Sequence, residues 1–193
     1  MKFKHVQGYT LIELLVVIFL ITGLTSILVF NGSGARKAVK VDRATKQLEG
    51  ALKEVQALGN SGRAFPQDEA DVEINYDRGY GVYVEEGEGE VIIYGGKSPA
   101  DPDNVLPAEE KYTALNTYET IVFEGGVTVQ DVNFPGNQKP DVSVLFRRGV
   151  NGAKIHSSGG GPHENREWVE ITVGVDSTTK QIRVNKQGLI EIL

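Results

Sequence analysis

The sequence predicts an α+β fold in which a long N-terminal helix, membrane-spanning in its first half, packs on antiparallel β-sheet. Three observations favour this fold. An apolar run continues to Phe30, and at about 1.5 Å of rise per residue such a run covers roughly the 30 Å core of a bilayer. Residues 35–58 carry apolar side chains at spacings of three and four, as an amphipathic helix does. Short β-branched and aromatic runs, separated by glycine-rich and proline-rich turns, fill the rest of the chain.

Glu13 is the residue of the apolar run that needs explanation. A carboxylate inside a membrane-spanning segment costs about 2.5 kcal/mol or more unless it is near an interface, neutralised or paired. One interpretation is a signal-anchor helix whose Glu13 reaches the cytoplasmic surface. The other is that cleavage after Gly8 leaves Tyr9 with a free amino group, which pairs with Glu13 of a neighbouring copy.

Residues 8–17, with the sequence GYTLIELLVV, resemble the class III signal of type IV pilins and type II secretion pseudopilins. In that family a prepilin peptidase cuts after the glycine and methylates the amino group of the next residue. The resemblance therefore implies that Gly8 is the cleavage site, that Tyr9 is the N-methylated first residue, and that Glu13 registers subunits in a filament. Tyr9 differs from the usual phenylalanine, and Phe30 stands where major pilins commonly carry proline.

The resemblance also implies a division of the chain into four parts. These are a leader (1–8), a transmembrane and assembly helix (9–30), an amphipathic continuation of the helix (31–60) and an extracytoplasmic, β-rich, pilin-like domain (61–193). The basic leader places the N-terminus in the cytoplasm. The expected localisation is therefore a single-pass protein of the inner (cytoplasmic) membrane before cleavage, and an extracytoplasmic filament afterwards.

Partners and chemistry follow from the same resemblance. The expected partners are other pilin or pseudopilin subunits, the prepilin peptidase and an inner-membrane assembly platform. The expected role is structural, without enzymatic activity and without a cofactor. The alternatives are a DNA-binding minor pilin for natural transformation and a signal-anchored extracytoplasmic β domain, which predicts no cut after Gly8.

The helix is expected to have a weak point and a defined end. Asn31-Gly32-Ser33-Gly34 is poor helix material, because glycine loses backbone entropy and Asn and Ser compete for backbone hydrogen bonds. Beyond it, one apolar stripe is formed by Ala44, Leu48, Ala51, Leu52, Val55 and Leu58. Residues 59–62, Gly-Asn-Ser-Gly, suit a helix C-terminus.

Strand signals follow to the end of the chain. The expected strands are Tyr80 to Val84, Glu90 to Tyr94, Thr120 to Glu124, Val127 to Val132, Val142 to Arg147, Trp168 to Val175, Gln181 to Asn185 and Leu189 to Leu193. Residues 95–108, with three prolines, are expected to form a long loop. The large aromatic side chains of Phe146 and Trp168 are expected to fill the core.

The C-terminal half resembles one branch of the family more closely. Residues 142–146, 169–173 and 181–190 are similar to the sheet of H-type minor pseudopilins and of the related minor pilin that binds DNA. This resemblance implies a minor subunit. Basic side chains that could contact DNA are Arg147, Arg148, Lys154, Arg183 and Lys186, although the apolar, acidic C-terminus lacks the basic motif of the DNA-binding relative.

Composition limits the other functions. With 20 basic and 26 acidic residues the net charge is −6, so the chain has no global attraction to nucleic acid, and DNA binding is not expected. It has no cysteine, which excludes disulfides and thiolate zinc sites. Asp101 and Asp103 are weak calcium candidates, since the EF-hand pattern fails around them. His156 and Ser157 lack the spacing of a nucleophile elbow, and metal or acid-base catalysis has little support.

Overall fold

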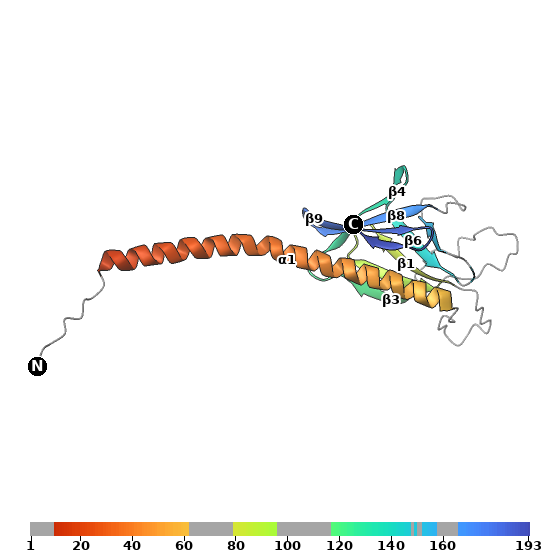
Figure 1. The fold of residues 1–193 in the computed structure, drawn as a ribbon, viewed down its shortest axis with the longest axis horizontal. Helices are drawn as coiled ribbons and strands as arrows, with labels where there is room; N and C mark the ends of the chain where they lie inside the picture. The colour runs from red at the N-terminus through yellow and green to blue at the C-terminus, as the bar shows by residue number, and fades with distance from the viewer. Residues whose placement is uncertain (1–9, 62–78, 96–116, 148, 150–151, 158–165) are drawn as a thin grey trace, which may run out of the picture. The chain divides into compact units, whose positions relative to one another are not determined.

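A computed structural model describes residues 10–61, 79–95, 117–147, 149, 152–157 and 166–193, without the side chains of 27–33 and 137. The described chain contains one helix followed by ten strands (Figure 1). It divides into two compact units, Met1–Lys37 and Ala38–Leu193, and helix α1 runs through both. The strands all belong to the second unit.

The bounds of the elements are α1 Leu11–Ser61, β1 Tyr80–Glu85, β2 Glu90–Gly95, β3 Thr117–Val122, β4 Thr128–Phe134, β5 Asn137–Gln138, β6 Asp141–Phe146, β7 Ala153–His156, β8 Trp168–Val175, β9 Thr178–Asn185 and β10 Ile190–Ile192. The expected strands thus all have a counterpart within a few residues. The remaining two strands, β5 and β7, were not expected.

Helix α1 has 51 residues without a break. The helix continues through residues 31–34, so the weak point expected there does not interrupt it. A glycine inside a helix costs only about 1 kcal/mol relative to alanine. Two such residues are tolerated when long, hydrogen-bonded helix precedes and follows them.

The strands form two antiparallel sheets of five strands each. The first sheet has the order β3-β2-β1-β6-β7 and the second has the order β10-β9-β8-β4-β5. Strands β1 and β6 pair over six residues, from Tyr80↔Phe146 to Glu85↔Asp141. Strands β8 and β9 pair over eight residues, from Trp168↔Asn185 to Val175↔Thr178. The strands expected to form antiparallel β-sheet are thus divided between two sheets.

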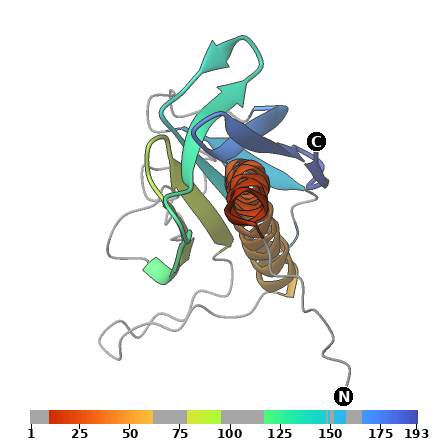
Figure 2. The same ribbon diagram turned by 90° about the vertical axis from the view of Figure 1, so that its left-hand side faces the viewer.

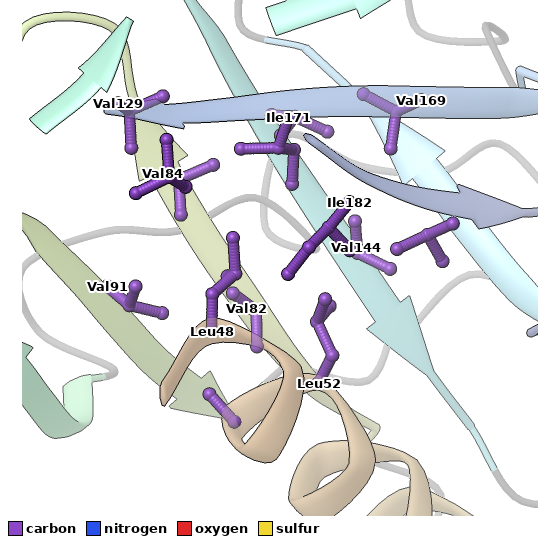
Figure 3. Close-up of a cluster of buried hydrophobic side chains, with 14 of the residues drawn as sticks. Leu48, Leu52, Val82, Val84, Val91, Val129, Val144, Val169, Ile171 and Ile182 are labelled. Atoms are coloured by element: carbon purple, nitrogen blue, oxygen red, sulfur yellow. The ribbon is translucent and has the colours of Figure 1, made fainter. Parts of the chain in front are cut away.

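The core of the second unit lies where α1 meets both sheets. Leu48 and Leu52 of α1 are fully buried and belong to one cluster with Val82 and Val144 of the first sheet and Ile171 of the second (Figure 3). Figure 2 shows strands of both sheets beside the part of α1 that belongs to the second unit. The apolar stripe predicted for the helix is confirmed. Its members Ala44, Leu48, Ala51, Leu52 and Val55 are buried, and Leu58 packs against them.

Polar contacts at the surface also tie α1 to the strands and turns. The Asp42 carboxylate is 2.5 Å from Lys180 Nζ of β9 and 2.9 Å from Lys46 Nζ. Arg43 Nη1 lies 2.8 Å from Glu124 Oε2, in the turn that connects β3 to β4. These pairs link the helix to segments that lie far away in the sequence.

The described part of the chain contains no helix long and apolar enough to cross a membrane. The prediction that the first half of the helix spans a membrane is corrected by this finding. So is the localisation that depended on it, a single-pass protein of the inner membrane.

The predicted fold class is therefore wrong. It combined a membrane-spanning first half of the helix with packing on an antiparallel sheet. The structure has no membrane-spanning helix within its described residues, and its strands form two sheets rather than one. The physical reason for the second difference is that period-two alternation shows which strands are half-buried but not which strands share a sheet.

Candidate assembly site at the start of helix α1

Thr10 and Glu13 form a capping box at the beginning of α1. The backbone N–H and the hydroxyl of Thr10 both donate to Glu13 Oε2, each at 2.9 Å. The backbone N–H of Glu13 donates in return to Thr10 Oγ1 at 3.4 Å. Thr10 is therefore the N-cap residue and Glu13 occupies the third helical position, as in the sequence pattern Thr-x-x-Glu.

These hydrogen bonds explain the electrostatics of Glu13. The bond from the Thr10 backbone N–H, followed by the bond from its hydroxyl, holds the pKa of Glu13 below its ordinary value. An acidic side chain in the first helical turn also faces the positive end of the helix dipole. Glu13 is thus favoured as a carboxylate, and its exposed position leaves it accessible to a cation.

The helical turns that follow present apolar side chains on every side. From Leu11 to Leu24 the exposed fraction of the large apolar side chains ranges from 49% at Val16 to 83% at Leu11. These exposed residues are Leu11, Ile12, Leu14, Leu15, Val16, Val17, Ile18, Phe19, Leu20, Ile21 and Leu24. A helix that is apolar all round is normally buried among other apolar groups. This segment, residues 11–24, is called the apolar segment below.

The polar side chains next to the apolar segment are satisfied within the helix. The hydroxyls of Thr22, Thr25 and Ser26 donate to the carbonyls four residues earlier, at 2.5, 2.7 and 2.8 Å. An open groove of about 470 Å³ lies along one face, with Phe19 and Gly23 among its lining residues. Since these hydroxyls already have acceptors, the groove can be covered by apolar side chains without leaving an unsatisfied donor.

The processing residues cannot be placed in the same way. Gly8 and Tyr9 lie outside the described residues, so the cleavage and methylation expected there stay predictions. Glu13 lies in the first turn of α1, as described above. The capping box that it forms with Thr10 was not predicted from the sequence. The Thr-x-x-Glu pattern that precedes the apolar run is the signal that could have found it.

The structure describes four of the five basic residues suggested for DNA contact. Arg148 lies outside the described residues. Arg183 of β9 is paired with Glu170 of β8 through its Nε at 2.9 Å, and its guanidinium lies 5.4 Å from the Trp168 ring. Its charge is therefore already compensated by Glu170.

The other three basic candidates come from two different sheets. Arg147 follows β6, Lys154 is on β7, and Lys186 follows β9. The two sheets approach each other here, because the Ala153 backbone N–H donates to the Lys186 carbonyl at 2.9 Å. The fold thus brings the segments that carry Lys154 and Lys186 together. Arg183, however, is already paired with Glu170 of the same sheet.

The remaining candidates give no site. Asp101 and Asp103 lie outside the described residues, so the calcium suggestion stays a prediction. Within the described ranges no three His, Cys, Asp or Glu side chains are grouped closely enough to hold a metal ion. His156 and Ser157 are buried on and after β7, where the Ser157 hydroxyl donates to Asp141 Oδ1 at 2.9 Å.

The two aromatic residues expected in the core have different positions. Phe146 is fully buried, which confirms that prediction. Trp168 is only partly buried, and its ring lies beneath the Arg183 guanidinium instead.

Comparison of the chain with protein-family models, with curated proteins and with solved structures finds no match.

Proposed function

We propose that this chain is a minor subunit of a type IV pilus or of a type II secretion pseudopilus. A prepilin peptidase cuts it after Gly8 and methylates Tyr9, and the mature chain assembles through the apolar segment of α1. The role is structural: neighbouring subunits bundle their helices, and Glu13 of one subunit compensates the amino group of the next.

The observation that carries this proposal is the uncovered apolar segment. Its large side chains are 49–83% exposed, whereas those of Leu48 and Leu52 further along the same helix are fully buried. At about 25 cal/mol for each Å² of apolar surface removed from water, covering such a segment is strongly favourable. Bundled helices of other subunits provide that cover.

The polar side chains in and next to the apolar segment support the same proposal. The hydroxyls of Thr22, Thr25 and Ser26 are satisfied within α1, so a bundle can close around them without losing hydrogen bonds. Glu13 is the single ionisable residue between Thr10 and Ser26. In a bundle its charge needs one specific cationic partner, and a partner at a fixed place sets the register of the subunits.

The test is intact mass and N-terminal sequencing of the extracted chain, with and without a co-expressed prepilin peptidase. With the peptidase, the mature chain is expected to begin at N-methylated Tyr9. Gly8→Ala is expected to abolish the cut. Gly34→Ala is the matched control, because an added Cβ at Gly34 has no atom within 4 Å, and it is expected to be cut like the wild type.

A chain that still begins at Met1 in the presence of a peptidase active on another substrate would overturn the proposal. So would cleavage at a different bond, since only a cut after Gly8 places Glu13 at the fifth position of the mature chain.

A further inference from the structure

We draw no further inference here: the strongest candidate, the exposed edge strand β3 of the first sheet, which pairs only with β2 among the described strands and leaves Val122 63% exposed, carries nothing because nothing in the structure shows what covers that edge.

Discussion

Asp42 is the residue through which α1 is held electrostatically to the second sheet. Its two oxygens face Lys180 of β9 and Lys46 of the next helical turn, at 2.5 and 2.9 Å. The hydrogen bond from Lys180, and then that from Lys46, lowers the pKa of Asp42 to about 2. Because the pair is exposed to solvent, we expect a modest contribution that salt weakens.

The first prediction is therefore a pH-dependent effect of Asp42→Asn. A carboxyl group whose pKa is lowered on folding stabilises the fold above its ordinary pKa and ceases to do so as the pH falls through the lowered value. The variant is expected to be less stable than the wild type at pH 7, with a difference that shrinks below about pH 4 and is lost once the pH is below about 2. Urea unfolding at several pH values measures this.

Glu49→Gln is the control for Asp42→Asn. Glu49 pairs with Lys53 at 2.6 Å, but both residues belong to α1, so this pair connects no separate elements. A smaller effect is expected for it. Equal effects of the two variants would mean that Asp42 does not tie the helix to β9.

At the scale of the element, the end of α1 is fitted closely against β6. Gly59 is buried, and a Cβ added there would lie 2.7 Å from the Phe146 carbonyl carbon and closer still to its oxygen. Such a contact is with backbone, which cannot turn aside as a flexible side chain can. The glycine that the sequence analysis assigned to helix termination is thus also required for packing.

The second prediction follows from this contact. Gly59→Ala is expected to destabilise the fold by about 1–3 kcal/mol, the range for overpacking a well-filled site. Gly50→Ala, in the same helix and with no atom within 4 Å of the added Cβ, is expected to stabilise it by about 0.5–1 kcal/mol. Denaturant unfolding of both variants measures the two signs. A stabilising Gly59→Ala would show that the helix end moves away from β6.

The whole molecule divides its apolar residues into two sets with opposite surroundings. The buried cluster draws its residues from Val41 onward, in the second unit. The apolar segment, in the first unit, is exposed. Among the described residues, the buried core and the exposed apolar segment therefore belong to different units of the chain.

The third prediction tests this separation. A chain that begins at Ala38 is expected to fold, with the near-ultraviolet circular dichroism of the second unit, and to stay monomeric in light scattering. The full chain at the same concentration is expected to associate through its exposed apolar side chains. Association of the shortened chain, or loss of its tertiary signal, would contradict the assignment of folding to one unit and assembly to the other.

The predictions that the structure confirms were based on the local spacing of apolar residues in helices and strands. The stripe from Ala44 to Val55 is buried because residues three and four apart share one face of a helix. Strand β9 buries Ile182 and Val184 and turns Arg183 outward, as period two requires. Strand β7 escaped prediction because its four residues include only one large aliphatic side chain, Ile155, and its conformation depends on pairing with β6.

The helical stripe, most of the strands and the position of the carboxylate at the start of the apolar segment could be predicted from the sequence alone, because they follow from the spacing of neighbouring residues. The arrangement of the strands in two sheets and the position of Trp168 under Arg183 could not be read from the sequence. These features depend on contacts between residues far apart in the chain, and no local period encodes such contacts.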